Sequence, residues 1–273
     1  MTRKIFFYCV FFSFALNAFN VLYDGDDVEE SFRTISINSR FDKDDYFKYF
    51  PNYRKYKEVN FFVDISQINI DSLPYPYNTL GQILSFNGNG SYVNSEFVER
   101  IFKNNDIVNA IEIGSDLGLS TRHIARLLPD NGKLYSIDIW TEYGPHYEPF
   151  LSNIVHCGLE KRIIPIRAYS AHAIYLIKLL NMQFDFIYVD GDHRTESVFN
   201  DLQLYFSLLS KVGVMAGDDW LLKSVRIAVI DFAKKYNLTI YADCNFFFLK
   251  KEGQFQIKSL LTATDQDYSF GSK

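Results

Sequence analysis

The 273-residue chain contains little of what marks several common protein classes. It has only three cysteines, and none of them shows the Cys-x-x-Cys or Cys/His spacing of a metal site. Basic residues are also few: 28 Lys and Arg stand against 33 Asp and Glu, which gives a formal net charge of −5. A general nucleic-acid-binding protein needs a basic face, so this balance argues against that function. The chain has no internal repeat and no long low-complexity run.

The apolar run near the N-terminus is shorter than a membrane span. It follows a basic start (Arg3, Lys4) and ends in small residues (Ala15, Ala18), which is the layout of a secretory signal peptide. We therefore expect residues 1–18 to be a signal peptide and the protein to be secreted or exported. An uncleaved membrane anchor and a buried N-terminal helix are the alternatives, and only the anchor would bring the protein to a membrane.

Export would make disulfide formation and glycosylation relevant. Cys157 and Cys244 could pair, although two distant single cysteines are more often buried and unpaired. Asn89-Gly-Ser and Asn237-Leu-Thr match the N-glycosylation pattern, which matters only for a eukaryotic source.

A glycine turn between a predicted strand and a predicted helix dominates the middle of the chain. The strand at 109–113 is followed by Gly114-x-x-x-Gly118 and by a helix that Ser120 or Thr121 can cap. Glycine lets the backbone approach a ligand closely, and the helix N-terminus faces the same crevice. In an open α/β sheet nucleotides bind in that crevice. The turn does not have the G-x-G-x-x-G spacing of a dinucleotide site.

Two acidic clusters follow later strands. Asp190-Gly-Asp192-His193 comes after the apolar segment 184–189, and Asp218-Asp219 comes after 212–216. Because the carboxyl ends of parallel strands open on one crevice, these carboxylates are expected to converge. Three carboxylates would repel one another unless a cation lay between them. Oxygen ligands of this kind suit Mg²⁺, or else Ca²⁺ or Mn²⁺.

Strands alternate regularly with helices from residue 109 onward, and two last strands at 238–242 and 245–249 are expected to pair as a hairpin. The pattern predicts an α/β protein with a three-layer, Rossmann-like fold: a mainly parallel, seven-stranded sheet with a C-terminal antiparallel hairpin. We place this domain at 80–250, after an N-terminal extension (19–79) and before a C-terminal tail (251–273). The extension is expected to pack onto the domain. A lid or a dimerisation arm is the alternative, which leaves a homodimer open.

The run Glu112-Ile-Gly-Ser-Asp-Leu-Gly118 resembles the first motif of class I S-adenosylmethionine-dependent methyltransferases. Asp138, at the end of the next predicted strand, matches their second motif. The sequence FIYVDGDHRTESVFNDLQLYFSLLSKVGVMAGDDW resembles the methyltransferase-24 group and the catechol-type metal-dependent O-methyltransferases. In the catechol-type enzymes an aspartate and a later acidic or amide pair hold the metal, at the spacing that separates Asp190 from Asp218-Asp219. The resemblance covers roughly residues 80–250.

The resemblance implies a methyltransferase fold, S-adenosylmethionine as cofactor, and a small-molecule hydroxyl as the acceptor. A divalent metal, Mg²⁺ first, would be held by Asp190, Asp218 and Asp219. His193 stands in the place of the catechol-type general-base lysine, so His193 and Asp190 are the expected catalytic residues. A histidine pKa near neutral suits a base. The implied cofactor-binding residues are Glu112, Gly114, Ser115, Asp116, Gly118, Ser120, Asp138, Ile139, Ser170 and Asp190.

Several alternatives stay open at this point. Trp140 and Tyr143 could stack on adenine, Trp220 could line the acceptor site, and Asp192 is expected to bond loop amides or cap the next helix. Asp190-Gly-Asp192 also fits the D-x-D of a metal-dependent glycosyltransferase. A catalytically silent, methyltransferase-like binding protein is the third reading. Export conflicts with the cytosolic supply of S-adenosylmethionine.

Overall fold

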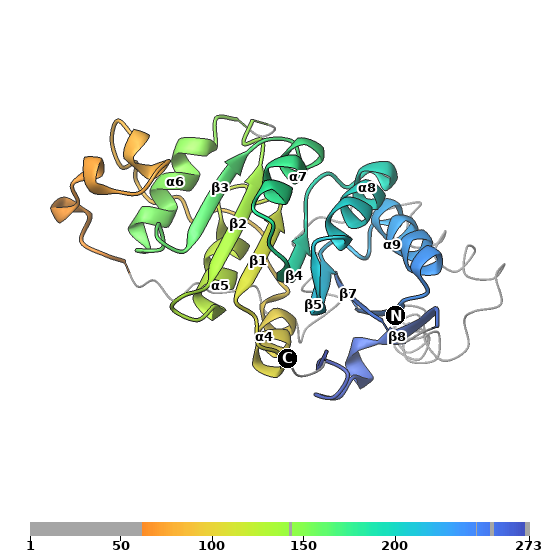
Figure 1. Cartoon of the computed structure of the whole chain (residues 1–273). Coiled ribbons are helices and arrows are strands. Elements are labelled where there is room, and N and C mark those ends of the chain that lie inside the picture. The colour runs from red at the N-terminus through yellow and green to blue at the C-terminus, as the bar shows by residue number, and fades with distance from the viewer. Residues whose placement is uncertain (1–61, 142–143, 244, 252–253, 271–273) are drawn as a thin grey trace, which may run out of the picture.

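The computed structural model of the chain describes residues 62–141, 144–243, 245–251 and 254–270 (Figure 1). The predicted signal peptide and most of the predicted N-terminal extension lie outside these residues. Within the described ranges, no helix is long and apolar enough to cross a membrane. Cys157 is buried, as expected, whereas Cys244 lies outside the described residues, so the structure does not test whether the two pair.

The described residues form an eight-stranded sheet in the order β3-β2-β1-β4-β5-β7-β6-β8. The first five strands of this order are parallel, β7 is antiparallel to β5 and β6, and β8 is parallel to β6. The strands are β1 (Asn109–Ile113), β2 (Lys133–Asp138), β3 (Ile163–Arg167), β4 (Phe184–Val189), β5 (Leu209–Gly217), β6 (Thr239–Asp243), β7 (Phe246–Lys250) and β8 (Gln256–Ser259).

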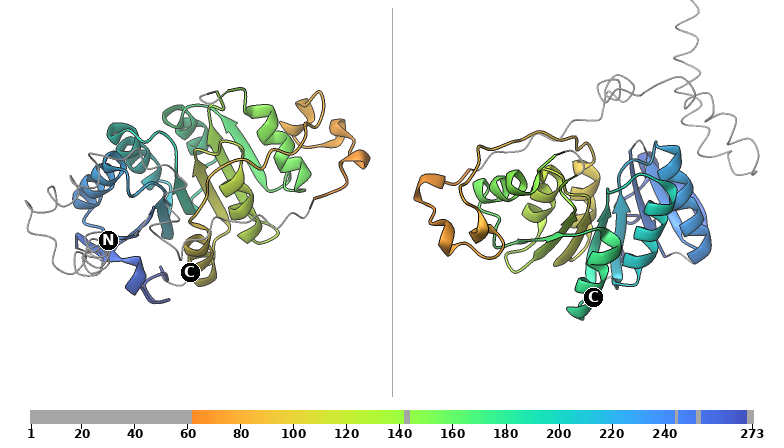
Figure 2. Two further views of the ribbon diagram at one scale, coloured as in Figure 1. Left: turned by 180° about the vertical axis from the view of Figure 1, so that it is seen from behind. Right: turned by 90° about the horizontal axis from the view of Figure 1, so that it is seen from above.

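Helices cover both faces of the sheet, as Figures 1 and 2 show. One face packs against α4 (Ser95–Asn104), α5 (Leu119–Leu127) and α6 (Tyr147–His156). The other face packs against α7 (Ser170–Leu179), α8 (Thr195–Phe206) and α9 (Lys223–Tyr236). All six side chains of β4 are buried, because a central parallel strand has helices on both sides. The predicted three-layer α/β fold with a mostly parallel sheet is confirmed.

The strand count differs from the prediction. An eighth strand, β8, lies in the segment that the sequence analysis treats as a C-terminal tail, and it extends the sheet beyond β6. Leu260 and Tyr268 follow it and are buried in the same core as α4. β8 is short and half-polar, so its sequence has no strand signal; the open edge of β6 and these two apolar anchors hold it in place.

Residues 62–79 pack beside the outer strand β3. They contain three short 3₁₀ helices: η1 (Ile65–Gln67), η2 (Ile70–Ser72) and η3 (Tyr77–Thr79). The buried Tyr77 hydroxyl donates to the Ile163 carbonyl of β3 (3.0 Å), and the Val63 N–H donates to the His156 carbonyl of α6 (2.9 Å). The chain therefore enters the described domain on the α6 side of the sheet.

The strand order reverses between β1 and β4. From β1 the chain builds outward through β2 and β3, then returns to place β4 on the other side of β1. The Asp190 N–H, just after β4, donates to the Ile113 carbonyl at the end of β1 (2.8 Å). In open α/β sheets ligands bind at such a reversal, beyond the carboxyl ends of the strands.

Candidate active site

The turn after β1 requires glycine at both of its ends. Gly114 has φ +88°, and a Cβ there would lie 1.8 Å from the Asp190 carbonyl oxygen. Gly118 has φ +83° and precedes the first residue of α5. Side chains rarely adopt such angles, so only glycine lets this turn lie directly against the residue that follows β4.

The expectation that Ser120 or Thr121 caps α5 is wrong. The helix begins at Leu119 after Gly118, and no side chain caps it. Both hydroxyls instead donate to the buried carboxylate of Glu112, Ser120 at 2.6 Å, and the Ser115 hydroxyl donates to it at 2.9 Å. A buried carboxylate is costly without such donors, and these hydroxyls supply them.

Glu112 therefore ties the turn to α5 from inside the domain. It is fully buried, and burial raises the pKa of its carboxyl to about 7, against the lowering effect of the three hydroxyls. Both carboxylate oxygens are occupied by hydroxyl groups of the chain. The structure does not test whether Glu112 contacts a cofactor. Its hydrogen bonds do show that it holds the turn in place.

Asp138 closes the same turn from β2. Its Oδ2 accepts the backbone N–H groups of Ser115 and Asp116, both at 2.9 Å, and its Oδ1 accepts the Trp140 N–H at 2.7 Å. Asp116 lies on the rim, where its carboxylate pairs with His146 Nδ1 at 2.6 Å. Ile139, next to Asp138, is half-buried. The predicted cofactor-binding residues of β1, β2 and the turn thus form one connected unit.

Trp140 does not lie where it could stack on a bound adenine. Its side chain is 2% exposed, its Nε1 donates to the Asp116 carbonyl at 2.8 Å, and its ring packs on Phe150 and Tyr147. The structure therefore makes it a core residue that holds the turn onto α6. Tyr143, the second stacking candidate, lies outside the described residues.

The acidic residues after β4 and β5 converge, as predicted. Asp190, His193 and Asp219 each offer a ligand atom within 4.8 Å of the others. His193 Nε2 lies 3.8 Å from Asp190 Oδ1 and 2.7 Å from Asp219 Oδ2. These two carboxylates, Asp190 first, raise the pKa of His193 to about 10. The three side chains come from two strand ends that meet only in the folded sheet.

Asp218, the third predicted ligand, is oriented differently. It is 7% exposed, and its Oδ1 accepts the Asp219 N–H at 2.6 Å and the Asn245 side-chain amide at 2.5 Å. Burial, and then the charges of Asp190 and Asp219, raise the pKa of Asp218 well above its usual range. Asp218 therefore lies beside the cluster. Its ionised form is unfavourable unless a positive charge offsets the charges of Asp190 and Asp219.

Two asparagines support this arrangement and were missed in the sequence. Asn245, in the turn between β6 and β7, donates to Asp218 and also to Asp219 Oδ1 (3.0 Å). Asn94, just before α4, is fully buried, and its amide lies 3.4 Å from the Tyr188 hydroxyl and 3.5 Å from the Asn245 carbonyl. Neither stands near an acidic motif in the sequence, so no local signal could identify it.

Asp192 does not point into the cluster. Its carboxylate accepts the Arg194 N–H and Nε and the Ser197 hydroxyl, and Arg194 first lowers its pKa to about 2. This agrees with the expectation that it binds loop groups, and it weakens the D-x-D interpretation. Ser170, the predicted adenine contact, begins α7, where its carbonyl accepts the Tyr205 hydroxyl at 2.8 Å.

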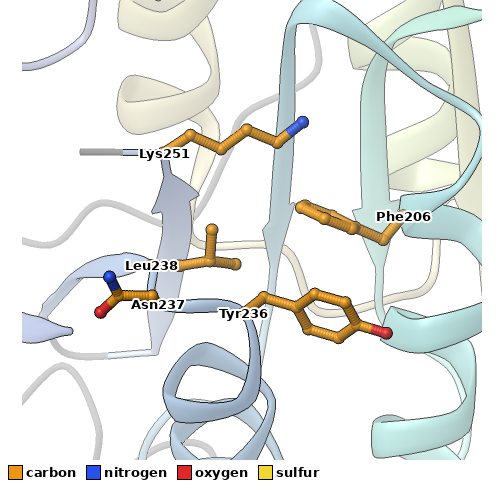
Figure 3. Close-up of a pocket in the computed structure, with 5 residues that line it drawn as sticks. All are labelled: Phe206, Tyr236, Asn237, Leu238 and Lys251. Carbon is orange, nitrogen blue, oxygen red and sulfur yellow. The ribbon is translucent and has the colours of Figure 1, made fainter. Parts of the chain in front are cut away.

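A separate cavity of about 280 Å³ lies at the opposite edge of the sheet (Figure 3). Its lining residues lie where three elements end: Phe206 is the last residue of α8, Tyr236 is the last residue of α9, and Asn237, Leu238 and Lys251 follow α9 and β7. These positions are at the amino ends of the parallel strands, whereas the acidic cluster is at their carboxyl ends. The cavity therefore belongs to a different part of the molecule from the candidate active site.

Comparison with known proteins finds similarity in the central part of the chain. Residues 111–220 match a family described as a methyltransferase domain. A protein of Arabidopsis thaliana is 28% identical over 157 residues (52% of this chain and 66% of its own), and one of Dictyostelium discoideum is 29% identical over 159 residues (56% and 59%). Both are named provisionally as caffeoyl-CoA O-methyltransferases. The matches span slightly less than two thirds of each relative's length.

A solved structure shows the same fold. The O-methyltransferase from Bacillus cereus, in complex with SAH, aligns with a TM-score of 0.50 and 18% identity, over 62% of this chain and 84% of that one. The family match begins in β1 and ends just after the Asp218-Asp219 pair, so it contains the glycine turn, Asp138 and the acidic cluster. The chain is therefore similar to methyltransferases over residues 111–220, and it has the fold of an S-adenosylmethionine-dependent O-methyltransferase.

Proposed function

We propose that the protein transfers the methyl group of S-adenosylmethionine to a hydroxyl oxygen of a small molecule, with the help of a divalent metal ion. One observation carries this proposal: the glycine turn after β1 lies directly against Asp190, which also belongs to the acidic cluster. A cofactor in the turn and an acceptor at the cluster would therefore be neighbours. Alignment of two bound reactants supplies much of what such a transfer needs.

The residues of the cluster fit a cation. Carboxylate oxygens of Asp190 and Asp219 are close enough to share one ion, and Asp218 is crowded by these two carboxylates. A positive charge between them would relieve that repulsion, and a mainly oxygen-donating set favours Mg²⁺ or Mn²⁺. When bound, such an ion would lower the pKa of a coordinated acceptor hydroxyl.

His193 is the group that would take the acceptor proton, at Nε2. Next to two carboxylates its pKa is about 10, so at neutral pH it already carries a proton and cannot act as a base. A cation on Asp190 and Asp219 would offset the charges that cause this shift. Metal and base are thus coupled in this proposal, because the histidine becomes competent only when its carboxylate neighbours are neutralised.

The acceptor needs two neighbouring oxygens to chelate a metal, a feature that the ring of caffeoyl-CoA has. Next to Asp219, the indole of Trp220 is 6% exposed, while Leu221 and Leu222 are 37% and 42% exposed. As close neighbours of the acidic pair in the chain, these leucines would offer an acceptor an apolar surface. An aromatic or otherwise partly apolar hydroxyl compound fits it better than an unsubstituted sugar.

Calorimetric titration of S-adenosylmethionine into the full chain, with Mg²⁺ and then with a chelator, tests the cofactor. We expect micromolar binding that Asp138→Ala and Glu112→Ala abolish and that the exposed control Asp106→Asn leaves unchanged. Circular dichroism establishes that each variant is folded. A folded wild type that binds no S-adenosylmethionine under either condition refutes the proposal, and a screen of UDP-sugars with Mn²⁺ would follow.

A second titration tests the metal. Mn²⁺ binding is followed by electron paramagnetic resonance in the wild type and in Asp218→Asn/Asp219→Asn. We expect the double variant to lose Mn²⁺ binding while it keeps S-adenosylmethionine binding, since the turn and the cluster are held by different contacts. Unchanged Mn²⁺ affinity in the double variant would rule out the cluster as the metal site.

Export of the mature chain after residue 18 also stays part of the proposal. Mass spectrometry of the protein from its native cells tests it, because cleavage after Ala18 leaves Phe19 as the first residue. An intact N-terminus would contradict it.

A further inference from the structure

The cavity at the amino ends of the parallel strands has no part in the proposed methyl transfer. Its volume is about 280 Å³. An apolar cavity of roughly 150 Å³ holds one benzene molecule, and the pockets that hold drug-sized ligands begin at about 300 Å³. The space therefore suits a compound of one ring with a small substituent.

One wall of the cavity is aromatic. In Figure 3 the rings of Phe206 and Tyr236 lie on one side of it, and Leu238 lies on the other. The centroids of the two rings are 5.3 Å apart. Both rings also contact the fully buried Phe232, with centroid distances of 5.3 Å and 4.7 Å. Leu238 is 2% exposed. Because buried residues hold this wall in place, it offers a preformed apolar surface to a flat ring.

Two ammonium groups lie beside the same wall. Lys251 Nζ is 4.7 Å from the centroid of the Phe206 ring, and Lys235 Nζ is 5.4 Å from that of Tyr236. Lys235 also donates to the side-chain carbonyl of Gln203 at 2.6 Å. In the part of the chain that the structure describes, neither lysine forms an ion pair with a carboxylate. The charge at the cavity is therefore positive, although the chain as a whole has a net charge of −5.

The helix ends at the cavity act against an anion, and the lysines offset them. α8 and α9 both end here, and the carboxyl end of a helix carries a partial negative charge. Lys234 and Lys235 lie in the last turn of α9 and compensate for that charge. Lys251 comes from the end of β7 instead, so its charge is left for a ligand. A cationic ligand would be repelled by three lysines, and an uncharged ring would leave Lys251 without a counter-charge.

We propose that this cavity is a binding site for a small aromatic carboxylate. The ring of the ligand lies against Phe206 and Tyr236, and its carboxylate pairs with the ammonium group of Lys251. The site uses no residue of the glycine turn or of the acidic cluster. Binding therefore requires neither S-adenosylmethionine nor a metal ion.

Benzoate is the probe, because it consists of one ring and one carboxylate. It is titrated into the full chain in the presence of a chelator, and the protein signals are followed by NMR. We expect a dissociation constant of about 1 mM or lower, with nuclear Overhauser contacts from the benzoate ring to Leu238 and Tyr236. Benzamide has the same shape and no charge, so it should bind at least about tenfold more weakly.

Lys251→Met removes the charge and keeps an unbranched side chain. We expect it to weaken benzoate binding at least about tenfold and to leave benzamide binding unchanged, a difference that a change in packing alone would not produce. Lys103→Met, at an exposed position of α4 in the opposite layer, is the matched control and should bind benzoate like the wild type.

Three outcomes overturn the proposal. The first is a folded wild type that binds no benzoate at about 10 mM. The second is a set of Overhauser contacts to the glycine turn or the acidic cluster instead of the cavity. The third is benzoate binding that Lys251→Met leaves intact or that benzamide equals. Because the titration contains neither S-adenosylmethionine nor metal, its failure leaves the proposed methyl transfer untouched.

Discussion

The substitution Glu112→Gln measures what it costs to keep a charged carboxylate inside the glycine turn. Glu112 is fully buried, and the hydroxyls of Ser115, Ser120 and Thr121 are its donors. Glutamine has the same shape and no charge. One of its two terminal groups still accepts hydroxyl protons, and the other can donate to a hydroxyl oxygen. The substitution therefore removes the charge with little change in packing.

The sign of the effect follows from the direction of the shift. The pKa of Glu112 is about 7 in the folded protein against 4.5 for an ordinary glutamate, so the folded state holds the proton more tightly. The stability that this proton contributes is present below pH 4.5 and is lost as the pH rises to about 7. A pKa change of this size corresponds to about 3 kcal/mol of unfolding free energy.

Urea unfolding of the wild type and of Glu112→Gln at pH 4.5 to 8 measures how the difference in their unfolding free energies changes with pH. We expect the variant to gain about 3 kcal/mol relative to the wild type between pH 4.5 and pH 7, and nothing further above pH 8. Other titrating groups cancel in this difference. The exposed Glu148→Gln should show no such trend. A difference in unfolding free energy that does not change with pH would mean that burial does not raise the pKa of Glu112.

Three further predictions concern the turn and the cluster. Gly114→Ala should abolish S-adenosylmethionine binding and destabilise the fold by more than about 1 kcal/mol, since its Cβ would lie 1.8 Å from the Asp190 carbonyl oxygen; a variant with normal calorimetric affinity contradicts this. The ring of His193, followed by NMR, should titrate near pH 10 without metal and at least one pH unit lower with Mg²⁺. Asn245→Ala should weaken Mn²⁺ binding by about ten- to a hundredfold, because its amide orients the Asp218-Asp219 pair; unchanged affinity would make the amide irrelevant to the metal.

The parts of the fold that were predictable are those with a strong local pattern. The segment 184–189 is an uninterrupted apolar run apart from Asp185, and it forms a central strand with helices on both faces. The glycine turn and the regular strand–helix alternation likewise fix the three layers. β8 has no such pattern, because a four-residue strand of Gln, Ile, Lys and Ser depends on a free edge nearby for its pairing.

The candidate site also has parts that the sequence could predict and parts that it could not. The convergence of Asp190 with Asp219 was predictable, since both follow adjacent parallel strands and only sheet topology is needed. The direction in which each side chain points was not. Trp140 lies only two residues after Asp138, yet Phe150 of α6 and the Asp116 carbonyl turn its ring into the core. Such orientations depend on contacts between segments that are distant in sequence.

The contacts of Asp138 set a limit on how it could recognise a cofactor. A carboxylate offers about four acceptor positions, and three of them receive the backbone N–H groups of Ser115, Asp116 and Trp140. One position is left, so Asp138 can accept a single ribose hydroxyl while the turn keeps this shape. Recognition of both ribose hydroxyls would then require either a second acceptor on the rim or the release of one amide. Asp116 is one candidate for that acceptor, because its backbone N–H already contacts Asp138, and its pairing with His146 would have to open to make its carboxylate available. The affinity for the ribose is therefore tied to the conformation of the turn as well as to the charge of Asp138.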